Sequence, residues 1–420
     1  MSDPNGVPAQ VLRGLQLKDI GRYADAEKAF REALAQEPND AFALHHLAAC
    51  QFHQPNRHRE ALETINNAVA LQPNEVDHHI LRAFILCVLD CPKEALAAAQ
   101  TALQLAPTSD AAFAAEAQAH LQLTHWAEAE RAARQALALD ADNSTAANQL
   151  AQALRLQNKM VENAGHLAGM LARDPEDPYT HANAGWSALQ RGQHREAEVH
   201  FREALRLNPG FDSAREGLLN SFRARSPLYR GYLRYCFAMQ RLSAGSRWGV
   251  LIGVYVAARF ASRLKGGFGF AFMALYFVFV LWVWVARPFG NLMLLFDRFA
   301  RYALRRNEKV EAAVVGGGLT IGILALGAGM AVNSEVTQTA GIGLIAMSFP
   351  LSMTFTNGAK AGAILFGAVG AITFLGTVLC LVAAAVPALV AVARQVLLVG
   401  CVGSLLSTWL GNIPALRKPA

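Results

Sequence analysis

The sequence predicts an all-α protein built in two parts, an α-solenoid of repeated helix pairs followed by a bundle of helices that cross a membrane. Two observations predict this architecture. Alanine and proline recur about every 34 residues through the first half of the 420-residue chain. Long apolar runs dominate the second half, where acidic residues become rare. Repeated helix pairs stack into solenoids, and apolar runs of about 20 residues are long enough to span a bilayer.

Two columns of alanine and one of proline carry the repeat. The spacing is 35 residues once and then 34 or a multiple of it, so a single insertion near residues 55–59 explains the irregular step. Alanines seven residues apart share one face of a helix and allow a second helix to approach closely, and proline ends each second helix. The columns are Ala26, Ala61, Ala95, Ala129 and Ala197, then Ala33, Ala68, Ala102, Ala136 and Ala204, then Pro38, Pro73, Pro107, Pro175 and Pro209.

The pattern resembles the tetratricopeptide repeat. Gly21-Arg22-Tyr23 followed by Ala26, Phe30, Ala33 and Pro38 carries the resemblance, and residues 192–209 repeat it. It covers residues 7–225 as about six repeats and a closing helix, which predicts a superhelical domain at residues 1–225. Repeat five departs from the pattern, because Gly165 and Gly169 lie inside its second helix, and we expect it to be the least stable unit.

The resemblance also implies a partner-binding groove lined by the first helices of the repeats, in which peptide segments of other proteins lie. For Trp186, packing against the closing helix is an equally good interpretation. The clamp for a terminal carboxylate found in some relatives is missing. The implied lining residues are Phe42, His45, Phe52, His53, Ile80, Phe84, Cys87, Gln118, Leu121, Gln122, Asn148, Gln152, Arg155, Tyr179, Trp186 and Gln190.

Charge divides the chain at the same place as hydropathy. Residues 1–222 contain 19 basic and 28 acidic residues, a net charge of −9, whereas residues 223–420 contain 19 basic and 4 acidic residues, a net charge of +15. The basic charge lies beside apolar runs, which favours membrane lipid over nucleic acid as its partner. A juxtamembrane linker at residues 226–247 and a membrane domain at residues 248–420 are therefore predicted.

Six spans are predicted in the membrane domain, with five or four as open alternatives. The spans are Trp248–Leu264, Phe268–Ala286, Ala312–Val332, Gly341–Phe355, Gly362–Val382 and Leu389–Leu410. If the repeats are cytoplasmic, fifteen flanking basic residues lie inside and two or three outside, as the positive-inside rule requires. This count predicts that both chain ends are cytoplasmic. The C-terminal half is also similar to uncharacterised bacterial membrane proteins that carry an N-terminal repeat array, which implies a bacterial inner membrane.

Two basic amphipathic segments, at residues 227–243 and 288–306, are predicted to lie as helices in the membrane surface. Apolar burial and anionic lipid would hold them there. Ordinary basic loops remain the alternative. The residues expected to contact lipid are Arg230, Arg234, Arg241, Arg298, Arg301 and Arg305.

Small residues inside the spans predict close helix packing, either within one chain or between protomers, so a homo-oligomer or a larger membrane complex stays open. The expected positions are Gly318, Gly322, Ala363 and Gly367. No phosphate-binding loop, nucleophile motif or metal-ligand spacing occurs. We therefore expect no catalytic residues, metal or cofactor. The sequence favours a membrane-anchored adaptor that is not an enzyme; the alternative is a repeat-regulated transporter, channel or lipid-handling protein.

Overall fold

The structure is a computed structural model that describes residues 9–242, 244–261, 267–298, 300–355, 357–410, 413 and 416. Helices are the regular elements of these residues, and the predicted fold class is confirmed. The chain divides into two compact units, each described by itself below. Unit 1 contains Met1–Ser187, Arg206–Pro209 and Ala238–Trp248, and unit 2 contains Ala188–Leu205, Gly210–Phe237 and Gly249–Ala420. The domain boundaries predicted at residues 225 and 247 stay predictions.

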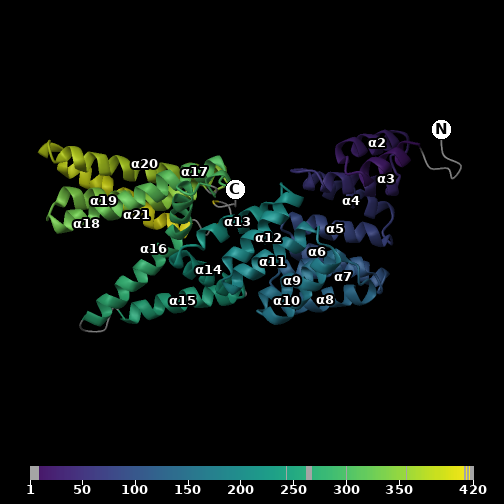
Figure 1. Cartoon of the computed structure of the whole chain (residues 1–420). Coiled ribbons are helices and arrows are strands. Elements are labelled where there is room, and N and C mark those ends of the chain that lie inside the picture. The colour runs from purple at the N-terminus through teal and green to yellow at the C-terminus, as the bar shows by residue number, and fades with distance from the viewer. Residues whose placement is uncertain are drawn as a thin grey trace. The chain divides into compact units, whose positions relative to one another are not determined.

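Among the described residues, twelve helices alternate along the repeat array as first and second members of antiparallel pairs (Figure 1). The first helices are α1 (Ala9–Asp19), α3 (Ala41–Phe52), α5 (Val76–Val88), α7 (Asp110–Gln122), α9 (Ser144–Leu156) and α11 (Pro178–Arg191). The second helices are α2 (Tyr23–Gln36), α4 (His58–Leu71), α6 (Pro92–Leu105), α8 (Trp126–Leu139), α10 (Met160–Arg173) and α12 (His194–Leu207).

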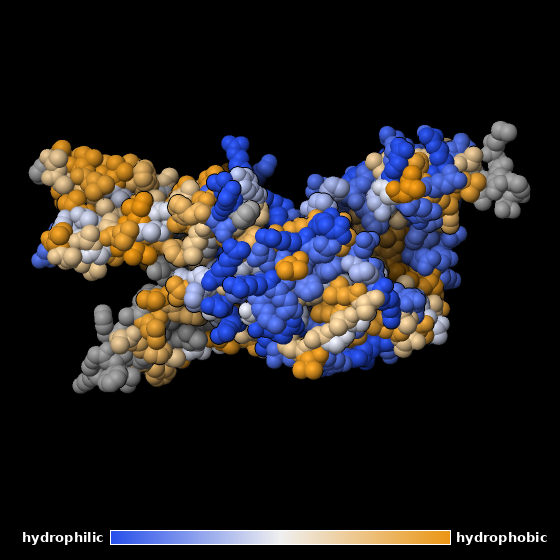
Figure 2. All heavy atoms as spheres, in the orientation of Figure 1, coloured by the Kyte–Doolittle hydropathy of each residue, from blue (hydrophilic) through white to orange (hydrophobic). Residues whose placement is uncertain are grey.

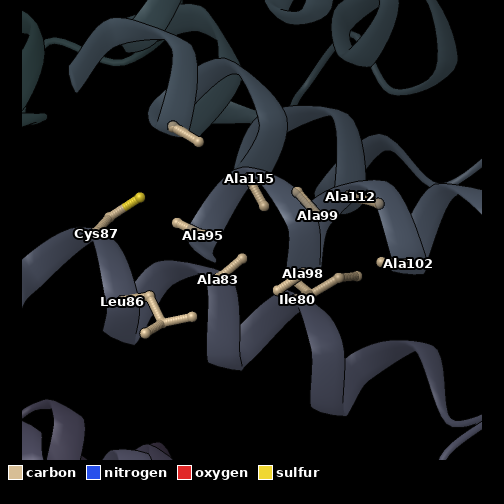
Figure 3. Close-up of a cluster of buried hydrophobic side chains, with 11 residues drawn as sticks. Ile80, Ala83, Leu86, Cys87, Ala95, Ala98, Ala99, Ala102, Ala112 and Ala115 are labelled. Carbon is tan, nitrogen blue, oxygen red and sulfur yellow. The ribbon is translucent and has the colours of Figure 1, made fainter. Parts of the chain in front are cut away.

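The alanine columns are the packing surface of the second helices, as the sequence predicts. Each of the ten alanines is at most 4% exposed. Figure 3 shows Ala95, Ala99 and Ala102 of α6 pointing toward Ala83 of α5 and Ala112 and Ala115 of α7. Methyl groups let three backbones approach, and dispersion attraction between the closely packed helices holds adjacent repeats together.

A left-handed residue joins the two helices of every repeat. Positive φ angles occur at Gly21, Asn56, Asp90, Thr124, Asn158 and Gly192, which follow the same 35- and 34-residue spacing. Glycine adopts this conformation without strain, whereas asparagine and aspartate tolerate it better than a β-branched residue. The extra residue predicted near residues 55–59 lies in the connection 53–57, which is longer than the connection 89–91 of the next repeat.

Polar side chains begin several of the first helices. Asp40 accepts hydrogen bonds from the backbone N–H groups of Phe42 and Ala43, and Ser109 and Asn143 cap α7 and α9 in the same way. The caps satisfy backbone donors that no helical carbonyl can reach. The caps fix the residue at which each of these first helices starts, and so decide which of its side chains point to the same side of the array.

The remaining helices follow in chain order. They are α13 (Asp212–Arg223), α14 (Pro227–Gln240), α15 (Ala244–Ala261), α16 (Gly267–Leu295), η1 (Ala300–Tyr302), α17 (Arg306–Glu311), the π-helical turn η2 (Ala312–Gly316), α18 (Gly317–Ala331), α19 (Glu335–Phe355), α20 (Lys360–Ala383), η3 (Pro387–Leu389) and α21 (Val390–Leu410).

Four helices among the described residues are long and apolar enough to cross a membrane. They are Arg306–Ala331, Glu335–Phe355, Lys360–Ala383 and Val390–Ser407, and they match the last four predicted spans. Their outer surface is apolar, as the orange of Figure 2 shows, and it includes the exposed side chains of Leu324, Ile364 and Leu398. The first two predicted spans fall on α15 and α16, whose side chains lie partly outside the described residues, so these spans stay predictions.

Glycines set the closest contacts of the bundle. A methyl group added to Gly322 would lie 3.1 Å from the carbonyl oxygen of Gly341, so this predicted position is a close contact within one chain. Gly318 and Gly367 make ordinary contacts, at 3.4 Å or more, and Ala363 is half-buried. Closer approaches join α20 and α21. A methyl group added to Gly376 would lie 2.6 Å from Leu397 Cα, and one added to Gly400 would lie 2.6 Å from Thr373 Cα.

The predicted helix at residues 288–306 is wrong. Helix α16 continues through Pro288 to Leu295, and the chain then turns. Asp297 accepts a hydrogen bond from the backbone N–H of Ala300, and the carboxylate of Glu308 accepts one from the backbone N–H of Arg305 to start α17. Such bonds from side chain to backbone compete with a continuous helix, which the spacing of apolar residues alone predicted.

Candidate functional site: the first-helix face and a buried polar network

Aromatic and histidine side chains gather on the first helices α3 and α5 of repeats two and three, a surface called here the first-helix face. Phe42 is 50% exposed, and its ring meets the ring of His46 edge-on with centroids 4.4 Å apart. His45 Nδ1 lies 3.2 Å from His78 Nδ1 of α5, and His53 stacks on Tyr23 with ring centroids 4.4 Å apart. The cluster offers flat apolar surface with polar edges, which suits recognition of a peptide segment.

The histidines of this cluster are held neutral at pH 7. Burial lowers the pKa of His45 from 6.5 to about 4, with a contribution from His78, and lowers the pKa of His46 to about 3, with a contribution from Lys18. Burial also lowers the pKa of His53 and that of His78. Protonation would place like charges beside one another in a poorly hydrated site, so these four histidines are uncharged above about pH 6.5.

Several predicted lining residues are in the core instead. Ile80 is 8% exposed and Leu121 is 5% exposed, and both pack in clusters with the alanine columns. Cys87 is buried beside Ile80, and Phe52 and Phe84 are half-buried against the same layers. These positions recur with the period of the repeat, but their side chains face the core between helices. Assigning them to the groove was wrong for Ile80, Leu121 and Cys87.

Amide side chains on the later first helices α7, α9 and α11, among them the predicted lining residues Gln118 and Asn148, form a ladder of hydrogen bonds between neighbouring repeats. Gln149 donates to Gln118 Oε1 at 3.3 Å, and Asn183 donates to Asn148 Oδ1 at 2.8 Å. Asn148 in turn donates to Asp177 at 3.0 Å. Gln122 donates to the carbonyl of Cys87 at 2.8 Å. These bonds between repeats satisfy polar groups internally, so the amides hold the stack in register rather than offer all their groups to a partner.

A later segment of the chain contacts the array near α8 and α9. Residues 238–248 belong to unit 1, where Trp126 Nε1 donates to the carbonyl of Arg241 at 3.3 Å. Burial and the neighbouring Arg241 lower the pKa of Arg155 to about 10. Arg241, predicted to contact lipid, therefore lies against the array. Of the other predicted lining residues, Tyr179 is 53% exposed, and Gln152, Trp186 and Gln190 are half-buried.

Three glutamates at equivalent positions of the second helices each bind a side chain of the following repeat or closing helix, an interaction that the sequence analysis did not predict. Glu27, Glu130 and Glu198 each follow an alanine of the first column and each bind the residue 27 positions later: Gln54 at 2.8 Å, Gln157 at 2.6 Å and Arg225 at 3.1 Å. Burial opposes ionisation of Glu27 and Glu130, but hydrogen bonds from their partners outweigh it and lower the pKa of both carboxyls. This column of glutamates is visible in the sequence once the repeat register is known.

Unit 2 contains a buried network centred on Arg223, whose side chain is fully buried. Its guanidinium donates to Asn291 Oδ1 of α16 at 2.6 and 3.0 Å, to Asn220 Oδ1 at 2.8 Å and to Glu216 at 3.1 Å. Tyr229 of α14 donates to Asn220 Oδ1 at 2.9 Å. Three helices thus share one charged centre, and the fork of the guanidinium fixes their arrangement.

The few acids of the second half concentrate around this network. Glu308 of α17 pairs with Arg215 at 2.9 Å, and Asp297 pairs with Arg225 at 2.8 Å. Glu311 is 1% exposed at the start of the first described span and accepts a hydrogen bond from Ser352 of α19 at 3.2 Å. Glu311 lies just before the span predicted at residues 312–332, but the apolar helix begins at Arg306 and therefore contains it.

The remaining predicted lipid-contacting residues differ in their surroundings. Arg230 is half-buried, whereas Arg234 and Arg298 are exposed. Arg301 donates to the hydroxyl of Tyr302 at 2.8 Å, and Arg305 pairs with Asp212. Within the described part of the chain, no three His, Cys, Asp or Glu side chains are placed to hold a metal ion.

These features define an array of helix pairs joined to apolar helices, and comparison with known proteins identifies the array. Residues 19–83, 114–178 and 178–211 match the tetratricopeptide repeat family. The N-terminal part of this chain is therefore a tetratricopeptide repeat array, as its sequence predicts.

Individual relatives match part of the chain. The DnaJ homolog subfamily C member 7 homolog of Schizosaccharomyces pombe is 28% identical over 180 residues, a match that covers 39% of this chain and 37% of that protein. The chain thus spans well under half of that relative's length. A tetratricopeptide repeat protein from Parabacteroides merdae is 16% identical, with a TM-score of 0.43 over 58% of this chain and 96% of that one. A thermophilic repeat protein of Thermus thermophilus is 20% identical, with a TM-score of 0.33 over 50% of this chain and 96% of that one.

Proposed function

We propose that this protein is a membrane-anchored adaptor whose first-helix face binds a peptide segment of a partner protein. Tetratricopeptide repeat proteins generally bind partner proteins and typically act as scaffolds rather than enzymes. The observation that carries the proposal is the exposed ring of Phe42 beside the neutral His45–His78 pair, in a chain that also contains four helices long and apolar enough to cross a membrane.

We further place the array at the cytoplasmic face of a bacterial inner membrane. The charges at the two ends of the described bundle support this orientation. Successive helices run antiparallel, so one end carries three basic residues, Arg306, Lys309 and Lys360, together with Glu308 and Glu311. Among the described residues the other end carries one basic residue, Arg394, and Glu335. The basic end is the cytoplasmic one by the positive-inside rule. Cysteine placed at residue 2 should escape an impermeant reagent in intact cells; labelling there would reverse the orientation.

Copurification from gently solubilised membranes tests the adaptor role. Phe42→Ala should weaken binding of the main partner about thirtyfold and reduce its recovery, because truncating an aromatic anchor commonly costs about 2 kcal/mol. Phe42 suits the test better than Phe52 or Phe84, which also pack in the core. Val161→Ala is the matched control, since Val161 is 90% exposed on a second helix. Equal recovery with both variants would contradict binding at this face.

A second candidate function draws on Glu311. A buried carboxyl at the start of a span, bonded to Ser352 and followed by the π-helical turn η2, is typical of sites that handle ions or protons. A transporter regulated by the array is the function that this observation favours. Reconstituted vesicles would separate the two candidates, because Glu311→Gln should abolish a solute flux and leave partner recovery unchanged.

A further inference from the structure

A basic pocket lies between α11, α12 and α14 of unit 2. It has a volume of about 120 Å³. Four basic side chains, those of Arg191, His194, Arg230 and Arg234, line it, and no acidic side chain of the described residues does. Its apolar floor includes Leu233 and Phe237, both buried.

In the part of the chain that the structure describes, two arginines of the pocket have no acidic partner, and one histidine nitrogen has no hydrogen-bond partner. Arg191 already pairs with Glu196 at 3.0 Å. Among the described residues, Arg230 and Arg234 have no acidic partner, and the Nδ1 atom of His194 is buried with no hydrogen-bond partner. Two guanidinium groups one helical turn apart on α14 can bind one tetrahedral anion from the same side. The lining therefore suits an anionic group such as a phosphate.

A neighbouring hollow of unit 2 differs from this pocket in having an acid among its arginines. It has a volume of about 580 Å³ and is lined by Arg202 and Arg225, which pair with Glu198 at 2.7 and 3.1 Å. Glu198 lines that hollow and already binds both guanidinium groups, so an anion would have to compete there with a carboxylate. The pocket beside Arg230 and Arg234 has no such acid among its described lining residues.

The contacts of α14 favour a lipid as the source of the phosphate. The ring of Tyr235 meets the ring of Phe279 edge-on with centroids 5.4 Å apart, and Phe279 lies inside the predicted span at residues 268–286. Tyr229 of α14 lies against Gly290 near the end of the same helix α16. Helix α14 therefore runs along the C-terminal half of α16, from Phe279 inside the predicted span to Gly290 just beyond its end. The end of α14 near Tyr229 is then at the depth where phospholipid headgroups lie if that span crosses the membrane.

We propose that this pocket binds the phosphate of an anionic phospholipid, with Arg230 and Arg234 on the phosphate and Leu233 and Phe237 against the start of the acyl chains. The proposal rests on the membrane attachment in the proposed function. It makes the linker a specific lipid-binding element, distinct from a surface that is attracted to any negative membrane.

Native mass spectrometry of the full chain in detergent tests the site, with phosphatidylglycerol and phosphatidylcholine of identical acyl chains as probes. Replacing both residues, Arg230→Gln with Arg234→Gln, should weaken retention of phosphatidylglycerol about thirtyfold, as two lost basic contacts imply. The matched control, Arg298→Gln with Arg306→Gln, removes the same charge from exposed positions and should change retention little. Replacing Arg230 and Arg234 by lysine keeps the charge and should restore most of the binding.

Three outcomes would overturn the proposal. Equal losses in the two glutamine variants would mean diffuse charge attraction, and equal retention of the two lipids would exclude headgroup selection. Displacement of the lipid by millimolar inorganic phosphate would assign the pocket to a soluble phosphate. Membrane fractionation of the wild-type chain keeps the two proposals distinguishable, because a chain absent from membranes contradicts the anchor whatever the pocket binds.

Discussion

Replacing Arg223 by alanine should destabilise α13 far more than any surface substitution near it. The side chain is fully buried, and the change leaves Asn291 Oδ1, Asn220 Oδ1 and the carboxylate of Glu216 without this donor. Removing one partner of a buried charged network costs about 3–5 kcal/mol, because the acceptors left behind stay desolvated. Tyr229 still donates to Asn220, which places the expected cost toward the lower end.

Hydrogen exchange of the full chain in detergent measures this cost locally. A loss of about 3 kcal/mol should speed exchange of the α13 amides that open cooperatively by more than a hundredfold. Arg225→Ala is the matched control: its side chain is 48% exposed and pairs with Glu198 and Asp297, so the expected loss is below about 1 kcal/mol. Arg223→Lys should fall between them. Similar exchange in the two alanine variants would refute the role assigned to the buried network.

Three further substitutions or conditions test the array by hydrogen exchange. Protection of α3 should fall as the pH drops from about 6.5 to 4, because the folded pKa of His45 is about 4 and the unfolded chain takes up the proton first; constant protection would contradict the burial of this ring. Glu27→Gln should lower the free energy of unfolding by about 2 kcal/mol at pH 7, and this difference should disappear as the pH falls through the lowered pKa of Glu27. Glu32→Gln, at an exposed position of the same helix, should change the free energy of unfolding little. Gly165→Ala should stabilise α10 by about 0.5–1 kcal/mol, because its added methyl meets nothing within 4 Å, whereas Gly192→Ala, at a φ of +85°, should destabilise its turn.

The repeat register could be predicted from the sequence because each column has one physical cause. Alanine marks a close approach of helices, and the left-handed turn recurs from Gly21 to Gly192. The exposed side of a first helix could not be predicted as well. Ile80 and Phe42 both fit the groove pattern, and only the packing of α5 against α6 decides that Ile80 is buried.

Two features of the second half could not be predicted from local sequence patterns: the position of Glu311 within a span and the burial of Arg223. Glu311 belongs to a span because α17 and α18 join through a π-helical turn, which hydropathy does not report. In the sequence, Arg223 cannot be told apart from the other basic residues that flank the predicted spans. Its burial depends on Asn291, 68 positions away, so no local pattern reveals the network.

The most direct measurement is photo-crosslinking from the first-helix face in cells that express the full chain. A photoreactive phenylalanine analogue at position 42 should give one dominant protein adduct in the membrane fraction, because this side chain is exposed beside the histidine cluster. The same analogue at Val161, which is more exposed but lies on a second helix, should give none. The same adducts from both positions, or adducts only in the soluble fraction, would contradict a membrane-anchored adaptor that binds through its first helices.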